Sequence, residues 1–184
     1  VLLVGLLVVK HSFRSWIGAG LLVGFSLSLH PRASVLVIAL LVVGLTVSRI
    51  FPAALGATIG TGFSSVLVGL TDTWPTMRVE ALSGFPGASN IAATTGGQIL
   101  AVAGGTAGIG LVGLAAGLLG FWKPSAPIAS SMFFSISAIG VLLLGGWTLA
   151  GSARIDTLLY GRYIDPWSVP LLISGVTFAS SFRS

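Results

Sequence analysis

The sequence contains no cysteine and has very few charged residues. Without cysteine the chain has no disulfides, thiolate metal ligands or cysteine nucleophiles. Only 7% of its 184 residues are charged, against about 25% in an ordinary soluble domain. A chain of this size cannot bury so many apolar side chains away from water, which excludes a soluble globular domain. Its high hydrophobicity also excludes a disordered chain. The mean hydropathy of +1.04 therefore predicts lipid surroundings.

Histidine and acidic residues are also scarce. The two histidines, His11 and His30, fall on opposite predicted faces of the membrane, and no metal-binding or Gly-x-Ser-x-Gly motif is present. We therefore expect no metal site made from these residues alone and no certain cofactor. A carboxylate of this chain could still help to bind a divalent metal ion whose other ligands lie outside this sequence. The nine Lys and Arg give a net charge of +5, but they are scattered singly, which argues against a nucleic-acid partner.

Long apolar runs divide the sequence into membrane segments. A spanning helix needs roughly 20 mostly apolar residues, and continuous runs favour helices over barrel strands, which alternate apolar and polar residues. The segments are Val1–Val9, Trp16–Leu29, Ala33–Ser48, Pro52–Leu70, Gly96–Phe121, Pro127–Ala150 and Trp167–Phe182. The prediction is an all-α, polytopic transmembrane bundle with about six to seven membrane segments. Two short segments form a tight pair that is hinged at His30–Arg32.

The first residue already lies inside an apolar run. Val1–Val9 has no basic region before it and no small-residue cleavage site after it, so it does not have the pattern of a signal peptide. We expect residues 1–184 to form one incomplete transmembrane domain, an internal or C-terminal fragment of a larger protein. The rest of that chain would then be one of its partners, together with membrane lipids.

Glycine is abundant, at 26 residues. Small residues let membrane helices approach closely, and Gly113 and Gly117 form a small-xxx-small pair. This pattern predicts close helix packing, with a lipid or ligand groove as the alternative.

The charges are distributed unequally between alternate loops. One predicted side carries five basic residues and no acid: Lys10, Arg14, Arg49, Lys123 and Arg183. The other side carries Arg32, Arg78, Arg154 and Arg162 together with the four acids, Asp72, Glu80, Asp156 and Asp165. The positive-inside rule places the first side in the cytoplasm of a multi-pass plasma-membrane protein. The acidic loops 71–95 and 151–166 are then extracytoplasmic.

The densest group of polar and aromatic side chains lies in Arg154–Trp167. Arginine offers a planar fork of donors for phosphate, and the aromatic residues offer flat faces for a sugar or prenyl chain. A site for a lipid phosphate and a sugar needs this mixture, although aromatic residues and arginine also anchor helices at membrane interfaces. His30 and Arg32 form either a structural turn or a second phosphate contact. The candidate binding residues are Arg154, Asp156, Tyr160, Arg162, Tyr163, Arg32 and His30.

These motifs resemble those of actinobacterial polytopic membrane glycosyltransferase-like proteins, which are similar to the C-type glycosyltransferase superfamily. The matching elements are Leu29–Arg32 between two short helices, Gly97-Gln98 opening a long helix, Asp156, Tyr160–Tyr163 and Asp165. Relatives often carry His where this chain has Thr157. The resemblance implies transfer of a sugar from a polyprenyl-phosphate carrier outside the membrane. It also implies that the catalytic base is an acid in an earlier external loop, so no catalytic residue is assigned here.

Two other functions stay open. A transporter or permease fragment predicts charged residues or broken helices at mid-membrane. A non-enzymatic membrane scaffold predicts that the candidate residues are scattered around the bundle. No predicted span carries a charge away from its ends, which argues against ion or proton coupling.

Overall fold

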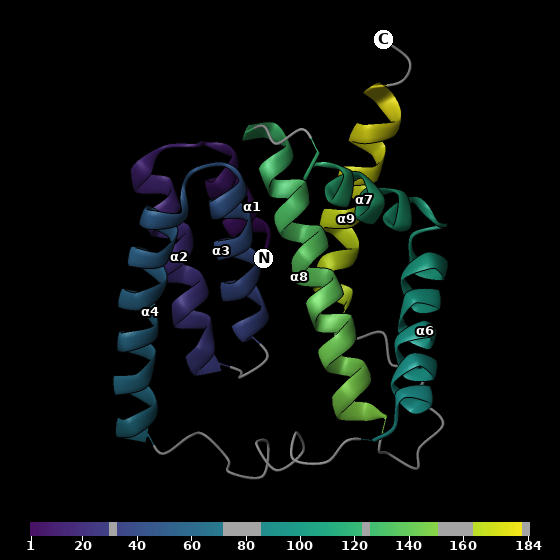
Figure 1. Cartoon of the computed structure of the whole chain (residues 1–184), viewed down its shortest axis with the longest axis horizontal. Coiled ribbons are helices and arrows are strands. Elements are labelled where there is room, and N and C mark those ends of the chain that lie inside the picture. Colours follow the sequence, from purple (N-terminus) through teal and green to yellow (C-terminus); the bar gives the residue numbers. More distant parts are fainter. Residues whose placement is uncertain (30–32, 72–85, 123–125, 151–163, 182–184) are drawn as a thin grey trace.

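The computed structural model describes residues 1–29, 33–71, 86–122, 126–150 and 164–181. All regular secondary structure in these ranges is helical, which confirms the all-α class (Figure 1). The helices are α1 (Leu2–Val9), α2 (Phe13–Leu29), α3 (Ser34–Thr46), α4 (Ile50–Thr71), α6 (Ala88–Gly105), α7 (Ile109–Leu119), α8 (Ala126–Leu149) and α9 (Asp165–Ser181).

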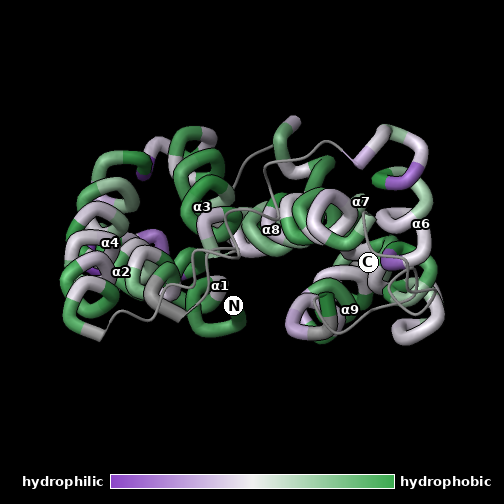
Figure 2. The backbone as a smooth tube through the Cα atoms, turned by 90° about the horizontal axis from the view of Figure 1, so that it is seen from below, coloured by the Kyte–Doolittle hydropathy of each residue, from purple (hydrophilic) through white to green (hydrophobic). Residues whose placement is uncertain are grey.

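Helix α8 is the centre of the bundle. Seen from below (Figure 2), it lies between a group formed by α1–α4 and a group formed by α6, α7 and α9. It contacts α1 and α3 on one side and α6, α7 and α9 on the other. Its residues Met132, Phe133 and Ala138 are fully buried in the core, so one helix joins both groups.

The first group is organised by glycines at the α2–α4 contact. A Cβ atom on Gly56 would overlap the carbonyl oxygen of Ile17, and one on Gly60 would overlap the carbonyl oxygen of Leu21. From the first contact to the second, the residue number rises by four in α4 and by four in α2, so the two helices run in the same direction. Gly24 in α2 approaches the α4 backbone equally closely. Close backbone contact through glycines four residues apart is a known mode of helix association in membranes.

Glycines also hold α7 in place. A Cβ atom on Gly113 would overlap the Leu171 carbonyl oxygen in α9, and one on Gly117 would overlap Ser135 in α8. Both glycines are buried. The predicted role of this pair in close helix packing is therefore confirmed.

The predicted continuous span Gly96–Phe121 is wrong. The chain bends by 112° between α6 and α7. Ala107 and Gly108 adopt positive φ angles of 50° and 79° at the corner, which ends α6. Thr106 bridges the bend, since its Oγ1 donates to the Val102 carbonyl oxygen at 2.7 Å and accepts from the Gly110 N–H at 3.0 Å. The structure thus satisfies the polar groups that the bend exposes.

The predicted loop boundaries also change. Residues 88–95, which we placed in the external loop 71–95, form the first turns of α6, and Asp165–Pro166 begin α9 instead of ending the loop 151–166. Polar residues such as Asn90 suggested a loop, but its Nδ2 donates to the Pro86 carbonyl oxygen at 2.9 Å and closes the first turn. The predicted places of Pro52 and Pro127 in the first turns of helices are confirmed.

The predicted number of six to seven spans is not supported either. In the described ranges, only Ile50–Leu70 and Ile128–Leu149 are long and apolar enough to cross a membrane alone. The bent pair α6 and α7 gives a third span if it is counted as one. Helices α1 and α3 have 8 and 13 residues, too few for a bilayer core that needs roughly 20. The sequence pattern was correct about apolar helices and wrong about their lengths.

Substituting Gly60 by alanine tests the α2–α4 contact. We expect Gly60→Ala to lower the free energy of unfolding by about 1–3 kcal/mol, because the new methyl group meets the α2 backbone. Gly62→Ala in the same helix is the matched control, since nothing lies within 4 Å of that position. It should leave stability unchanged or raise it slightly through better helix propensity. Thermal unfolding in detergent micelles measures both, and equal behaviour of the two variants would contradict the role of this contact.

Candidate functional site

The predicted binding residues occupy two connections between helices. His30 and Arg32 lie between α2 and α3, and Arg154, Asp156, Tyr160, Arg162 and Tyr163 lie between α8 and α9. All seven are outside the described residues, so their roles stay predictions. The described residues that border the two connections nevertheless restrict where each connection begins and ends.

Both connections border the same turn of α8. After the first connection, Val35 in α3 packs directly on Gly140, where a Cβ atom would meet its side chain. After the second connection, the Trp167 Nε1–H donates to Ser137 Oγ at 2.7 Å. Residues three apart on a helix are neighbours on its surface. The chain therefore enters α3 and α9 at the same level of α8, on the two sides of that helix.

Three of the helices that border these connections stop short of the lower end of the bundle. In Figure 1, α4, α6 and α8 reach farthest toward the lower end of the bundle, whereas α2, α3 and α9 stop before it. The bond between Trp167 and Ser137 agrees with this view, because Ser137 lies near the middle of α8. The lower ends of α2, α3 and α9 thus lie at a higher level in Figure 1 than those of α4, α6 and α8.

Trp167 belongs to the core. Its exposed fraction is 7%, and the neighbouring Ile164 is 1% exposed. With its indole N–H bonded to Ser137, which is itself fully buried, the ring stabilises the start of α9. The prediction that it offers a face for sugar or prenyl packing, or an anchor at the membrane interface, is therefore wrong.

A second polar feature lies between α6 and α8. Gln98 is 1% exposed, and neither its amide oxygen nor its amide nitrogen has a hydrogen-bond partner. A Cβ atom on Gly145 would lie 2.9 Å from Gln98 Oε1, and one on Gly146 would overlap Thr95 Oγ1, which also lacks a partner. A buried amide without partners costs free energy, and such groups concentrate where a ligand or water binds.

Gln98 was part of the sequence resemblance, as the opening of a long helix. In the structure it lies in the middle of α6, which begins at Ala88. Its burial was not predicted. The signal in the sequence was a single amide side chain within an apolar run, between Gly97 and Ile99. Its neighbours on α8 are two consecutive glycines, which leave room for the amide.

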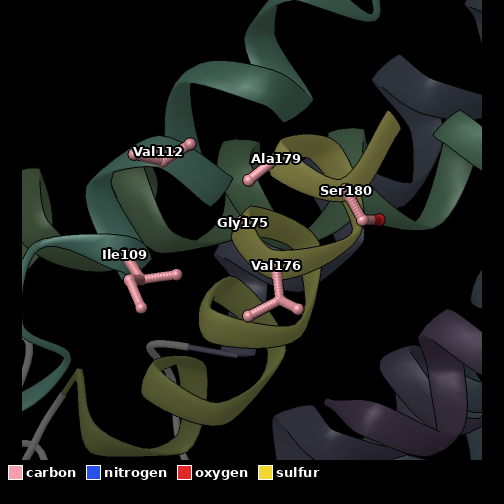
Figure 3. Close-up of a pocket in the computed structure, with 6 residues that line it drawn as sticks. All are labelled: Ile109, Val112, Gly175, Val176, Ala179 and Ser180. Carbon is pink, nitrogen blue, oxygen red and sulfur yellow. The ribbon is translucent and has the colours of Figure 1, made fainter. Parts of the chain in front are cut away.

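An apolar hollow of about 350 Å³ lies between α7 and α9. In Figure 3, Val176 and Ala179 of α9 lie near Ile109 and Val112 of α7. Gly175 and Ser180 complete the lining. The glycine-rich segment thus supplies both close packing and a groove next to it. An apolar hollow of this kind fits hydrocarbon chains better than a sugar or an ion.

Within the described ranges, no group of three or more His, Asp and Glu residues comes together to bind a metal. No family model matches this chain, and no curated protein and no solved structure matches it either.

Removing the Ser137 hydroxyl tests the attachment of α9. Ser137→Ala leaves the buried Trp167 Nε1–H without an acceptor, so we expect a loss of about 1–3 kcal/mol in the free energy of unfolding. Ser65→Ala is the control, because Ser65 is exposed and bonds only to the Thr61 carbonyl oxygen of its own helix. Adding Trp167→Phe to Ser137→Ala should recover part of the loss, since the orphaned donor is then gone. Additive effects would contradict the coupling.

Replacing Gln98 tests whether its buried amide, which has no hydrogen bonds, lowers the free energy of unfolding. We expect Gln98→Leu to raise the free energy of unfolding by about 1–3 kcal/mol, because two unsatisfied polar atoms leave the core. Gln98→Glu keeps the size but adds a charge, and should destabilise the protein. Chemical denaturation in detergent measures both. If Gln98→Leu instead destabilised the protein, the Gln98 amide would have to be hydrogen-bonded in the protein as isolated.

Proposed function

We propose that this chain belongs to a membrane glycosyltransferase that transfers a sugar from a polyprenyl-phosphate donor on the extracytoplasmic side of the plasma membrane. In this reaction a carboxylate from another part of the protein takes the proton of an acceptor hydroxyl. The acceptor oxygen then forms a bond to the anomeric carbon, while the bond from that carbon to the phosphate oxygen breaks. Polyprenyl phosphate leaves with the bonding electron pair.

The role we assign to this chain is to bind the donor. Negative charge grows on the phosphate as the glycosidic bond breaks, and arginine stabilises it through charge-assisted hydrogen bonds that strengthen in the transition state. Arg162 and Arg154 are the candidates for this contact, with Arg32 as a second phosphate contact. Asp156, Tyr160, Tyr163 and His30 would orient the sugar or hold the arginines.

The observation that carries the proposal is the shared turn of α8. Val35, just after the first connection, packs at Gly140, and Trp167, just after the second, bonds to Ser137 one turn earlier on the same helix. This supports the proposal that the candidate residues act together.

One observation favours a transporter as the second candidate. The bent pair α6 and α7 has the form of a discontinuous membrane helix, and Gln98 places unsatisfied polar atoms inside the bundle. Broken helices of transporters often present backbone groups to a substrate. Here, however, Thr106 already bonds to backbone groups on both sides of the bend, namely Val102 and Gly110. The bend therefore has a structural explanation, and we rank transport second.

Arg162 provides the direct test. In the full-length protein that carries this chain, we expect Arg162→Ala to lower the rate of transfer from a polyprenyl-phosphate sugar by about 100-fold, the size of effect of losing one transition-state donor. Arg162→Lys should restore only part of the rate, because lysine lacks the planar fork. Polyprenyl-phosphate glucose, mannose and arabinose are supplied in turn, and the labelled product is counted.

Arg183→Ala is the matched control, because the sequence places Arg183 on the opposite side of the membrane. Equal rates for Arg162→Ala and the unchanged protein would overturn the role of Arg162. No transfer from any polyprenyl-phosphate donor, together with uptake of a solute into proteoliposomes, would favour transport.

A further inference from the structure

The three basic residues in the described ranges lie at one end of the bundle. Lys10 ends α1, Arg14 lies in the first turn of α2, and Arg49 precedes α4. The turns that carry them lie together at the upper left of Figure 1. Arg49 Nη2 lies 3.5 Å from His11 Nδ1, which joins the two turns directly. The rings of Phe13 and Phe51 are 6.4 Å apart and add a second contact between them.

The Arg49 guanidinium group, which can only donate hydrogen bonds, has one N–H that no described group satisfies. Arg49 Nε is shielded from water and has no partner. A buried guanidinium N–H without an acceptor is costly, and an anion is the natural acceptor for it.

No carboxylate in the described part of the chain neutralises these charges. Asp165 is the single acid in those ranges, and it begins α9, whose attachment to Ser137 is near the middle of α8. The helices α2 and α4 also begin at this end, and the partial positive charge of a helix N-terminus adds to that of the side chains. The result is a concentration of positive charge that nothing in the described ranges compensates.

Apolar side chains surround this charge. Phe51 is 68% exposed, and Phe13 and Ile50 are also exposed beside the exposed Lys10 and Arg14. Exposed rings next to basic residues are typical of the boundary between headgroups and acyl chains. A soluble anion requires the charges but gives no reason for the apolar rings.

We propose that the basic end, defined as Lys10, His11, Arg14 and Arg49, binds the phosphate of an anionic phospholipid headgroup. Arg49 donates to the phosphate from Nε and its remaining N–H groups, His11 lies beside it, and Lys10 and Arg14 add charge from the rim. Phe13 and Phe51 pack against the upper acyl chains. This site is separate from the donor site proposed above and does not depend on it.

Lipid retention measures the site without any enzymatic assay. The chain is reconstituted in nanodiscs with equal phosphatidylglycerol and phosphatidylcholine, and native mass spectrometry counts the lipids that remain bound. We expect retention of phosphatidylglycerol over phosphatidylcholine, and a loss of about fivefold in this preference for each of Lys10→Gln and Arg14→Gln. Arg49→Gln should cause the largest loss, and Arg49→Lys an intermediate one. Ser65→Ala, at an exposed position of α4 about four turns away from Arg49, is the control and should retain the preference.

Lys10 and Arg14 are exposed, so their variants carry the test even if Arg49→Gln fails to fold. A preference that is absent, or equal in all variants, would overturn the proposal. Inorganic phosphate is the second probe, added to nanodiscs of phosphatidylcholine alone. If phosphate raises the unfolding temperature as much as phosphatidylglycerol does, and Arg14→Gln abolishes both effects, the ligand is a soluble anion and the lipid assignment is wrong.

Discussion

Backbone contact between helices through glycine is the constraint on which this bundle depends. Lipid is as apolar as the helix surfaces, so burial alone gives little reason for two membrane helices to associate. Close van der Waals packing must supply it, and packing strengthens as the helix axes approach. Gly56 and Gly60 bring α4 onto α2, while Gly113 and Gly117 bring α7 onto its neighbours. Any side chain at these positions would separate helices that have little else to hold them.

Helix α8 joins the two glycine-packed groups, and it does so with polar side chains as well as apolar ones. Ser131 bonds to Ser174 of α9, Ser135 to the Gly113 carbonyl oxygen of α7, and Ser137 to Trp167. These hydroxyls are small enough to keep the helices close and polar enough to fix their register. The position of α9 follows from the third bond, and that position sets where the connection 151–163 ends. Packing at the core therefore determines where α9 begins.

Hydropathy predicted the helical class and most of the helices, because apolar side chains must face lipid or core in any arrangement. It did not predict their lengths or the bend at Thr106–Gly108, because a glycine-rich run has the same hydropathy whether it continues or turns. The local signals there are hydrogen bonds from Thr106 to Val102 and Gly110, which a sequence pattern does not reveal. The candidate residues from His30 to Tyr163 lie outside the described ranges, so their convergence stays a prediction supported by Val35 and Trp167. The burial of Gln98 and Trp167 was missed, since the sequence analysis placed Gln98 at the opening of a helix and Trp167 among the aromatic residues of a surface loop.

The two ends of the bundle differ in the chemistry that they present, and this difference bears on the choice between transfer and transport. A path for a solute needs polar groups at successive depths, yet between the basic end and the level of Ser137 the buried core around α8 is formed largely by apolar residues such as Phe133 and Met132. Gln98 is the buried amide of α6, and it faces Gly145 of α8 without a partner. A buried amide without a continuous polar lining does not make a conduit for a solute, which is why transport stays the second proposal.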